Sequence, residues 1–518
     1  MDTQSFITGT WILISLYIGA ILFFVIRGAL KTQSIADFAV GNIKFSPTAV
    51  GLSLAASITS AATFVVNPGF IANYGLSGVL SFCVFFPFAA MVSLVVLTKS
   101  FRKYGQKIKA LTLAQWIGDR YNSKTYSLIM AFLSLLMITF IVLIVVAITK
   151  VLSKALNVEE IYVLIGLVIF VFGYMMFGGA NSMVYTNSIQ AIVMLVVAII
   201  LLTSGYEHFK GGIDAFVERL RNIDPVLVKA TNPESWLFRD FYEIIFAQIV
   251  VGIAVVVQPH IITKSLLLKD EKQVNKFLTV AVAAEALFFI VAFAGLYARI
   301  TFPDLTFQGE ALKNDGIIPA YVVAAFSQGW VSVIIGLIVI LGLISAGLST
   351  LEGLIQSVST TITSDIVKRL SPVALREKQL MWINKVAIIA LAAITIVISW
   401  EQIVSPKLSV GILAQNGVYA YFSAAFIPVL FGIFLKDVDY RAPLAATVTS
   451  IFVHFTVYYV LPVFVENYGL DLGFFTKYLQ GTVRNPAIAA SSAIVLSTIV
   501  GIVVHNITKR KKMVQAAY

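Results

Sequence analysis

Charge is scarce in this chain of 518 residues, because only 12% of the residues are Asp, Glu, Lys or Arg while 59% are hydrophobic. Soluble domains carry about 25% charged residues, so this composition excludes a soluble globular protein. The single cysteine, Cys83, excludes an intrachain disulfide. The longest hydrophilic interval, residues 206–240, is short enough to be a loop. The sequence therefore indicates an integral membrane protein that lies in a lipid bilayer.

Signatures of ATP-driven pumps and of enzymes are missing as well. No Gly-x-x-x-x-Gly-Lys-Ser/Thr phosphate-binding loop occurs, which argues against an ATP-driven pump. The four histidines and the one cysteine lack metal-ligand spacing, and no catalytic triad pattern is visible. The formal net charge of +11 does not indicate a nucleic-acid partner, because the basic residues lie between the apolar runs. We therefore expect a protein that is not an enzyme and binds no nucleic acid.

The chain contains instead a series of apolar runs, each long enough to cross a bilayer as an α-helix of about 18 residues or more. The first run is interpreted as a retained helix, because the residues before it lack the basic region of a cleavable signal. We expect an all-α membrane protein with 13 transmembrane helices. These cover residues 6–28, 47–75, 77–98, 125–152, 160–180, 182–204, 241–263, 276–301, 330–365, 380–400, 408–435, 442–464 and 485–507.

The basic residues are distributed unevenly between the two sides of such a bundle. If the N-terminus lies outside, the inner segments contain 25 of the 37 Lys and Arg residues. Inner loops of membrane proteins carry this excess of positive charge. The bias predicts a multi-pass protein of the cytoplasmic membrane, with the N-terminus outside and the C-terminus in the cytoplasm.

Two of the runs look interrupted. The second contains Asn67–Gly69, and the seventh ends near Gln258–His260, each with a proline. Unwound backbone at membrane depth is tolerated only where it is buried or lines a cavity. Interruptions in corresponding spans, here five spans apart, point to a transporter site between inverted repeats. The alternative is that these prolines mark ordinary kinks or, for Pro259, a helix end.

A stripe of small, oxygen-bearing residues runs along the ninth run. Ser345, Ser349, Gly353 and Ser357 recur at a spacing of four, and Thr350 lies beside Ser349. Such a stripe can serve helix packing, since hydroxyls in a bilayer need partners. Alternatively, its oxygens can replace the water shell of a small hard cation. A broken partner helix, which exposes backbone carbonyls, favours the second interpretation.

Six motifs occur in order along the thirteen runs. They are Leu54–Phe64 with Pro68-Gly69 and Tyr74-Gly75, Leu111–Tyr121, Gly178-Gly179 with Tyr185–Gln190, Gln258–Ile262, Ala346–Leu351 with Ser364–Ile366, and Phe426–Gly432. Each motif is weak alone, but together and in this order they are specific. They resemble those of the sodium:solute symporter family over essentially the whole chain.

The resemblance implies a LeuT-type fold, in which a 5+5 inverted repeat has one helix before it and two after. It divides the chain into an N-terminal helix with an inner loop, a first five-helix repeat, an extracellular loop, a second five-helix repeat, and two C-terminal helices with a basic cytoplasmic tail. The corresponding residues are 1–46, 47–205, 206–240, 241–435 and 436–518.

The resemblance also implies a sodium site between the first and eighth helices of the repeat core, which are the second and ninth runs. Carried over by position, its ligands are the backbone carbonyls of Ala56, Thr59 and Ala346 and the hydroxyls of Ser349 and Thr350. Sodium is the one cofactor that we expect.

One position suggests how many sodium ions are coupled. Asn187 stands where many family members have an aspartate that resembles part of a second sodium site. Without that carboxylate we expect one coupled sodium. The alternative is that oxygens of Thr186 or Ser188 still hold a second ion.

The candidate substrate site lies beside the break in the second run. The set is small, weakly polar and without fixed charge, and freed backbone amides can bind a carboxylate without a basic side chain. It favours a small organic acid, such as a monocarboxylate or a pantothenate-like acid, or an amino acid. We expect the site to be lined by Thr63, Phe64, Asn67, Gly69, Gln248, Val251, Gln415 and Tyr419.

Other substrates of the family fit less well. Ile58 and Ala62 stand where the proline branch usually has aspartate and tryptophan, which argues against proline. The third run offers no carboxylate or amide for a sugar. Gln415 could also serve helix packing instead of binding.

Two acidic residues inside the spans require separate interpretations, since intramembrane charge is costly. Glu352, two residues after Thr350, either faces a cytoplasmic release path or pairs with a polar neighbour. Glu285 in the eighth run serves helix packing or a pore rim, or else it couples transport to a proton.

The sequence therefore predicts a sodium-coupled symporter that imports a small solute by alternating access. The alternatives are a proton-coupled carrier that uses Glu285 and a symporter-like membrane sensor that works with a separate partner. The expected partners are a small-molecule substrate, the sodium ion and the lipid bilayer, and a monomer is compatible with the sequence.

Overall fold

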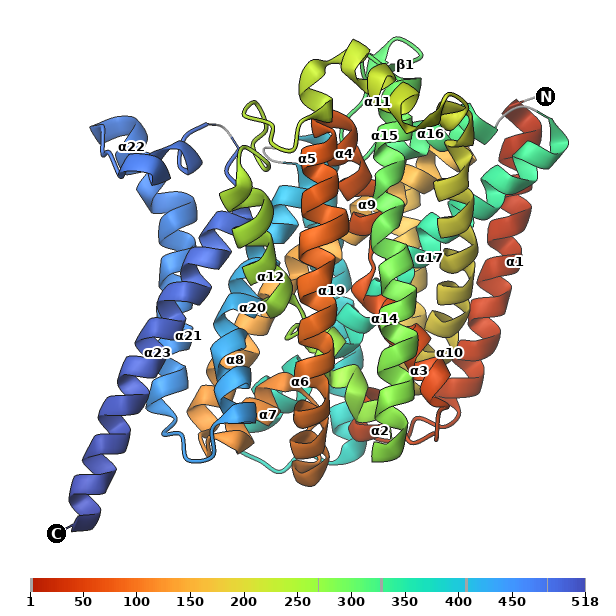
Figure 1. The fold of residues 1–518 in the computed structure, drawn as a ribbon. Helices are drawn as coiled ribbons and strands as arrows, with labels where there is room; N and C mark the ends of the chain where they lie inside the picture. The colour runs from red at the N-terminus through yellow and green to blue at the C-terminus, as the bar shows by residue number, and fades with distance from the viewer. Residues whose placement is uncertain (1–2, 269, 327–328, 406–408, 482, 518) are drawn as a thin grey trace.

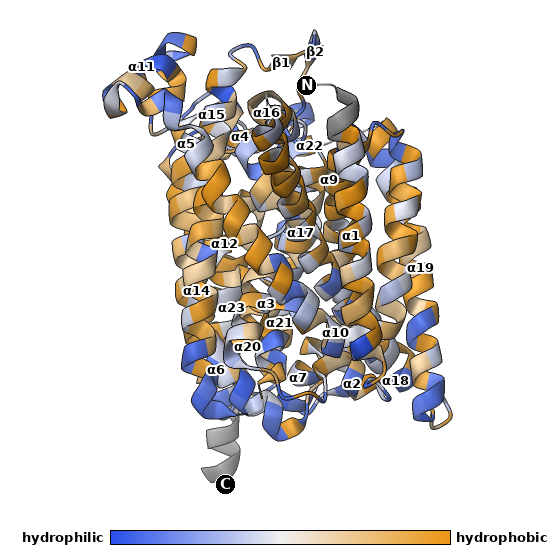
Figure 2. Cartoon of the chain, turned by 90° about the vertical axis from the view of Figure 1, so that its right-hand side faces the viewer, coloured by the Kyte–Doolittle hydropathy of each residue, from blue (hydrophilic) through white to orange (hydrophobic). Residues whose placement is uncertain are grey.

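The chain folds into a bundle of long, roughly parallel and antiparallel helices (Figure 1). This computed structural model describes residues 3–268, 270–326, 329–405, 409–481 and 483–517. Apolar residues surround the middle of the bundle, while hydrophilic residues gather at its two ends (Figure 2). This is the arrangement that a protein needs when a hydrocarbon layer surrounds its middle.

Ten helical segments in the described residues are long and apolar enough to cross a membrane, and two bent pairs raise the number to twelve. The bundle thus has about 10–12 apolar spans. Residue 408, where the sequence places the start of one span, lies outside the described residues. The long helices are α1 (Thr3–Ala29), α6 (Phe86–Ile108), α9 (Ile138–Leu156), α10 (Glu160–Ser204), α14 (Val274–Ile290), α17 (Trp330–Thr361), α19 (Glu377–Val404), α20 (Val410–Phe434), α21 (Arg441–Phe455) and α23 (Pro486–Ala517).

Shorter helical segments continue several of these helices, so that each helix and its extensions form one span. On the N-terminal side these are α5 (Leu76–Val79) and η2 (Leu80–Phe85) before α6, α8 (Lys124–Leu133) and η3 (Ser134–Met137) before α9, and η8 (Glu271–Gln273) before α14. On the C-terminal side they are η9 (Val291–Phe293) and α15 (Ala294–Thr301) after α14, η10 (Ile362–Val367) and α18 (Lys368–Leu370) after α17, and η11 (Thr456–Val460) and α22 (Leu461–Tyr468) after α21.

Helix α10 contains both of the runs predicted at 160–180 and 182–204. A straight helix of its 45 residues would be about 68 Å long, more than twice the thickness of a bilayer core. The backbone leaves the helical region at Gly179, with φ 60° and ψ −160°. A Cβ atom there would lie 2.7 Å from the ring of Phe38, so the position also requires a residue without a side chain.

Two helices are broken in the middle of the bundle. The first consists of α3 (Pro47–Ile58), η1 (Ala62–Val66) and α4 (Asn67–Tyr74), and it bends by 54° between α3 and η1. The second consists of η6 (Tyr242–Ala247), α12 (Gln248–Val255), α13 (Pro259–Ile262) and η7 (Thr263–Leu267), and it bends by 55°.

One of the two observed breaks lies where the sequence predicts it, and the other does not. The break near Gln258–His260 is confirmed, since the chain leaves the helix between Val255 and Pro259. The break predicted at Asn67–Gly69 is wrong, because the backbone becomes extended eight residues earlier, at Thr59, with φ −91° and ψ 102°. Pro68 instead lies inside a helical stretch that continues from Ala62 to Tyr74, at the point where the π-helical turn η1 passes into α4.

Short elements cover the two ends of the bundle (Figure 1). The interval 206–240, predicted as a loop, contains helical segments, so that prediction was wrong in detail. At this end lie η4 (Tyr206–Phe209), α11 (Gly212–Ile223), η5 (Pro225–Val228), the antiparallel strands β1 (Thr306–Phe307) and β2 (Glu310–Ala311), α16 (Ile317–Phe326) and η12 (Gly473–Tyr478). At the opposite end lie α2 (Ile35–Val40) and α7 (Leu113–Arg120).

An ion-pair cluster fixes η12 to the start of the second broken helix. Lys477 pairs with Asp240, and the Tyr478 hydroxyl donates a 2.7 Å hydrogen bond to the same carboxylate. Partial burial acts to raise the pKa of Asp240, but the hydrogen bonds from Lys477 and Tyr478 outweigh it and lower the pKa. The segment before α23 is therefore held against the core of the bundle.

Candidate functional site

A cluster of oxygen atoms lies where α17 passes the break in the first broken helix. The Ser349 hydroxyl is 2.7 Å from the carbonyl oxygen of Ala56 and 3.1 Å from that of Ala346. The Thr350 hydroxyl lies 3.4 Å from each of the same two carbonyl oxygens, and 3.5 Å from that of Thr59. The five residues predicted as sodium ligands are thus brought together, and all five are fully buried.

The carbonyl oxygens in this cluster outnumber the hydroxyl hydrogens that could bond to them. The carbonyl oxygen of Ser57, which the sequence reasoning did not include, adds a contact of 3.1 Å to Thr350. The two hydroxyls make six close contacts to carbonyl oxygens, although each hydroxyl can donate one hydrogen bond. Several oxygen atoms that converge without hydrogen atoms between them form the kind of ligand set that a hard cation requires.

The break itself supplies these carbonyl groups. The carbonyls of the last helical turn have no intrahelical partner, and here the last bond runs from the Thr59 N–H to Ala55. The carbonyls of Ala56, Ser57 and Thr59 are therefore free to face α17. In the described part of the chain, no group of three or more His, Cys, Asp or Glu side chains comes together. The donor set thus fits an alkali cation better than a transition metal.

Polar side chains surround the cluster on the side of α10. The Asn187 amide donates to the Ser57 hydroxyl at 3.1 Å and to the Ser349 carbonyl at 3.2 Å. Ser345, one turn before Ser349, contacts the Tyr17 hydroxyl at 3.2 Å and does not belong to the cluster. Asn187 therefore lies directly beside the oxygen cluster.

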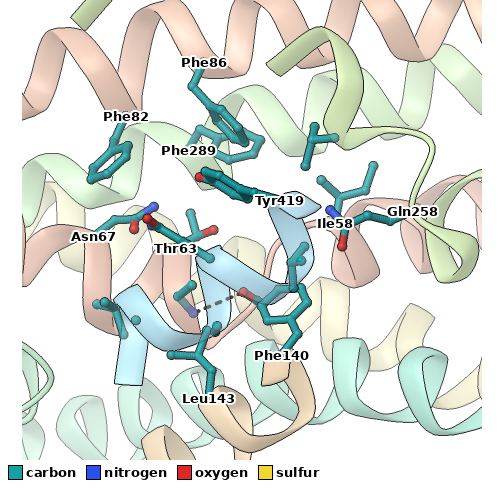
Figure 3. A pocket seen from close by; sticks show the side chains of 18 of the residues that line it. Ile58, Thr63, Asn67, Phe82, Phe86, Phe140, Leu143, Gln258, Phe289 and Tyr419 are labelled. Atoms are coloured by element: carbon teal, nitrogen blue, oxygen red, sulfur yellow. Dashed lines mark hydrogen bonds between the residues drawn. The ribbon is translucent and has the colours of Figure 1, made fainter. Parts of the chain in front are cut away.

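A cavity of about 90 Å³ lies next to the same break, on the side of Ile58 and Ser60 (Figure 3). Among the residues that the structure describes, no charged side chain lines it. Its polar lining consists of Ser60, Thr63, Asn67, Gln258, Gln415 and Tyr419. Its aromatic lining adds Phe82, Phe86, Phe140 and Phe289, and the remaining lining residues are Ile58, Ala62, Val66, Leu143, Val255, Ile261, Gly411, Ala414 and Val418.

Four of the eight predicted substrate residues line this cavity, namely Thr63, Asn67, Gln415 and Tyr419. Two predicted residues of the first broken helix do not line the cavity. Phe64 is fully buried, and its ring packs against Phe288 at 5.8 Å between centroids. Gly69 faces away from the cavity, since a Cβ atom there would lie 1.9 Å from the Asn314 carbonyl oxygen.

Gln248 and Val251, which were also predicted, lie outside the cavity. Both are buried in α12, before the second break, and neither lines the cavity. The cavity is lined instead by Val255, Gln258 and Ile261, which lie at that break. The sequence signal for Gln258 was its place directly before Pro259. A polar residue at a predicted break is therefore a better candidate for a substrate contact than a residue within the helix.

The two intramembrane acids lie in different surroundings. Glu352 pairs with polar neighbours, because Tyr174 and Thr186 each donate to its carboxylate at 2.6 Å and Gln190 donates at 3.2 Å. Glu285 is 1% exposed, and within the described residues neither of its carboxyl oxygens has a hydrogen-bond partner. It lines neither the cavity nor the oxygen cluster.

Comparison with known proteins shows to which family the chain belongs. The sequence model of the sodium:solute symporter family matches residues 38–449, which is well over half of the chain. The chain belongs to the sodium:solute symporter family. It is therefore a multi-pass membrane transporter and not an enzyme. The matched region includes both broken helices, the oxygen cluster and the cavity.

Individual members of the family share about a quarter of their residues with the chain. The sodium/pantothenate symporter of Escherichia coli (strain K12) is 26% identical over 424 residues, which cover 80% of this chain and 82% of the relative. The high-affinity proline transporter of Bacillus subtilis (strain 168) is 21% identical over 432 residues, 81% of this chain and 86% of the relative. These relatives carry different solutes, so they support the family and leave the substrate open.

A solved structure supports the fold. The chain superposes with a TM-score of 0.72 on a Na⁺-coupled sialic acid symporter in a substrate-bound outward-open state. The superposition covers 96% of this chain and 98% of that chain at 18% sequence identity. The bundle is therefore a LeuT-like transporter fold.

Proposed function

We propose that this protein is a symporter that couples the entry of one sodium ion to the uptake of a small organic acid by alternating access. The excess of converging oxygens around Ser349 and Thr350 is the observation that supports the sodium site most directly. Its ligands are the carbonyls of Ala56, Thr59 and Ala346 together with these two hydroxyls. Without a carboxylate in the shell, such a site releases its ion readily.

The first break connects this site to the cavity. Ala56 and Thr59 face the oxygen cluster, while Ile58 and Ser60 line the cavity. Sodium that binds first therefore fixes the backbone that forms one wall of the substrate site. Each sodium ion that enters down a potential of 100 mV supplies about 2.3 kcal/mol. This energy corresponds to roughly fifty-fold accumulation of a neutral solute.

A single coupled sodium is supported by the position of Asn187. Its amide hydrogens are used within the bundle, since they bond to the Ser57 hydroxyl and the Ser349 carbonyl. A neutral amide also supplies no counter-charge. We therefore assign one sodium ion to each transport cycle.

The cavity supports a monocarboxylate or a pantothenate-like acid more than an amino acid. It offers the amides of Asn67, Gln258 and Gln415 as hydrogen-bond donors, and several aromatic rings as apolar walls. It contains no acidic side chain to pair with an ammonium group. In the described part of the chain, the side-chain amide oxygen Oε1 of Gln258 has no partner, so it is available to a hydroxyl or amide of a substrate.

The same proposal includes the finer architecture. The bends of 54° and 55° in the second and seventh spans support two inverted five-helix repeats, over residues 47–205 and 241–435. With α10 divided at Gly179, the spans number thirteen. Helix α1 begins at one end of the bundle and α23 ends at the other, as an odd number requires (Figure 1). The basic residues place the start of α1 outside the cell.

A proton-coupled carrier is the second candidate, and the buried carboxyl group of Glu285 is the observation that favours it. An acid without partners inside a membrane is costly unless it is neutral or functional. Uptake in sodium-free medium that Glu285→Gln abolishes would establish this candidate over sodium symport.

A thermal-unfolding screen of the purified protein tests the proposal. Small monocarboxylates, pantothenate, amino acids and sugars are each added in sodium chloride and in potassium chloride. A ligand that binds the native state raises the unfolding temperature. We expect stabilisation by a carboxylic acid in sodium alone. Equal stabilisation in potassium would contradict sodium coupling, and stabilisation by sugars alone would contradict the substrate class.

A further inference from the structure

The first helix, α1, contacts different neighbours at its two ends. Near its C-terminal end, a Cβ atom on Gly28 would lie 2.3 Å from the Ser182 hydroxyl oxygen, so the backbone of α1 touches α10 there. Near its start, a Cβ atom on Gly9 would lie 2.8 Å from the side chain of Leu337 on α17. Beside Gly166 of α10, by contrast, no described atom outside its own helical turn lies within 4 Å of an added Cβ. Helices α1 and α10 therefore separate toward their starts.

A groove of about 280 Å³ fills the space between the separating helices, and α1, α9, α10 and α17 all line it. At its mouth, Trp11 is 49% exposed and Tyr162 is 67% exposed. At its floor, Ile344 is 4% exposed and Leu348 is 2% exposed. The groove thus leads from the outer surface of the bundle to the helix that carries the oxygen cluster. Its volume is close to that of the smallest ligand pockets, roughly 300 Å³.

The lining of this groove suits an apolar occupant. Among its described lining residues none is charged, and the only polar side-chain atoms belong to Trp11, Tyr17 and Tyr162. The Tyr17 hydroxyl already shares a 3.2 Å hydrogen bond with Ser345. A polar solute therefore finds few partners here, and apolar cavities of this kind do not hold water. If the groove stayed empty, its walls would lose their dispersion contacts.

The position of the groove shows what can fill it. Apolar residues surround the middle of the bundle (Figure 2), where the hydrocarbon of the bilayer lies. Trp and Tyr side chains gather at the edge of that hydrocarbon, so Trp11 and Tyr162 mark this level. From Tyr162 the lining continues along α10 to Phe170, which is about 12 Å further along the helix axis. The groove is therefore continuous with the lipid leaflet at the end of the bundle where α1 begins.

We propose that this groove binds one acyl chain of a phospholipid from that leaflet. The chain enters between Trp11 and Tyr162, and its end packs against Ile344 and Leu348. Since lipid chains are as apolar as the groove itself, shape and dispersion contacts select the bound chain. Leu348 directly precedes Ser349, so the chain packs against the turn of α17 that carries the proposed sodium ligands. That this is the outer leaflet rests on the orientation given in the proposed function, whereas the site itself does not.

Photolabelling of the full-length protein in vesicles of phosphatidylethanolamine and phosphatidylglycerol tests this site. The probe is a phosphatidylglycerol with a diazirine near the end of one acyl chain, and mass spectrometry of the digested protein locates the labelled residues. Any surrounding chain can reach Trp330, Val331 and Ile334, which are 69%, 50% and 48% exposed on the same helix and serve as the reference. A chain must enter the groove to reach Ile344 and Leu348. We expect label at both sets of residues.

Two variants that fill the groove should remove the label from its floor. In Gly166→Leu the new side chain enters open space, so label at Ile344 and Leu348 should fall at least about fivefold relative to the reference residues. If Gly166→Leu does not fold, Ile14→Trp fills the groove from α1 and should give the same loss.

Gly173→Leu is the matched control for Gly166→Leu. Gly173 lies about two turns further along α10 and outside the groove. It too has no described atom outside its own helical turn within 4 Å of an added Cβ. Label at Ile344 and Leu348 should therefore stay within about twofold of the wild type.

Three results would overturn the proposal. Label at the reference residues alone in the wild type would show that no chain enters. Equal label at Ile344 and Leu348 in the wild type and in both filling variants would show that the chain arrives by another route. An unlabelled floor together with a dimer in native mass spectrometry would show that a second copy of the chain covers the groove. None of these measurements uses sodium or a substrate, so this site and the proposed function can fail separately.

Discussion

The oxygen cluster and the neighbouring cavity share one stretch of unwound backbone, yet they are built in different ways. The cluster takes its oxygens from two elements, the break after α3 and one turn of α17, and its named residues are fully buried. The cavity is formed by residues of six helices, with aromatic rings on several of them. A hard ion needs a short, dense set of ligands, whereas an organic solute needs a shaped surface. Variants that affect one site and spare the other therefore test the assignment.

The largest effect is expected from the double variant Ser349→Ala/Thr350→Ala. Each substitution removes one oxygen ligand, and a bond to a charged group is worth about 1.5–3 kcal/mol. We expect the sodium concentration for half-maximal binding to rise about hundredfold or more, as measured with ²²Na⁺.

The matched control for this variant is Ser345→Ala, one turn earlier on the same helix. Its hydroxyl contacts Tyr17 and not the cluster, so sodium binding should stay within about twofold of the wild type. Equal losses in the control and in the double variant would show that the helix face serves packing.

Gly69→Ala should affect stability instead of binding. The added Cβ would overlap the Asn314 carbonyl oxygen, and overpacking of this kind costs about 1–3 kcal/mol. We expect a lower unfolding temperature with unchanged ligand affinity in the fraction that remains folded. Gly166→Ala is the control, since no atom lies within 4 Å of its added Cβ. A selective loss of ligand affinity in Gly69→Ala would return this residue to the substrate site.

The smallest effect is expected at the cavity wall. Gln258→Leu removes a buried amide that lines the cavity, and it should weaken substrate binding about fivefold while sodium binding stays unchanged. Gln248→Leu is the control of the same type, because this glutamine is equally buried and lies outside the cavity. Isothermal titration with the ligand from the unfolding screen measures both. A greater loss in the control would contradict the assignment of the cavity.

The same contrast explains which parts of the site could be predicted from the sequence. Ser349 belongs to a stripe of small residues at a spacing of four, which share one helix face, and Thr350 follows it directly. The partner carbonyls came from the family resemblance, and the structure places them against those hydroxyls. Half of the predicted substrate residues do not line the cavity, because convergence of several helices depends on their rotation. A helix break also resets the helical phase, as Gln258 and Gln248 show.

The position of the first break could not be predicted from the local sequence, for a related physical reason. Proline signals a missing donor, and Asn67–Gly69 was therefore the obvious candidate. Pro68 instead lies within the continuous helical stretch Ala62–Tyr74, and the break comes at Thr59, eight residues before Asn67. Its α3 segment ends in small residues and serines, whose hydroxyls and carbonyls find partners on α17 and α10. Tertiary contacts, which no local pattern encodes, decide where this helix opens.

Transport in proteoliposomes tests the central claim most directly. The ligand identified by the unfolding screen is supplied in radiolabelled form, outside vesicles that contain the wild-type protein and potassium. With an inward sodium gradient we predict accumulation above the external concentration, and loss of that accumulation when a sodium ionophore collapses the gradient. Equal accumulation when choline replaces sodium would contradict the account.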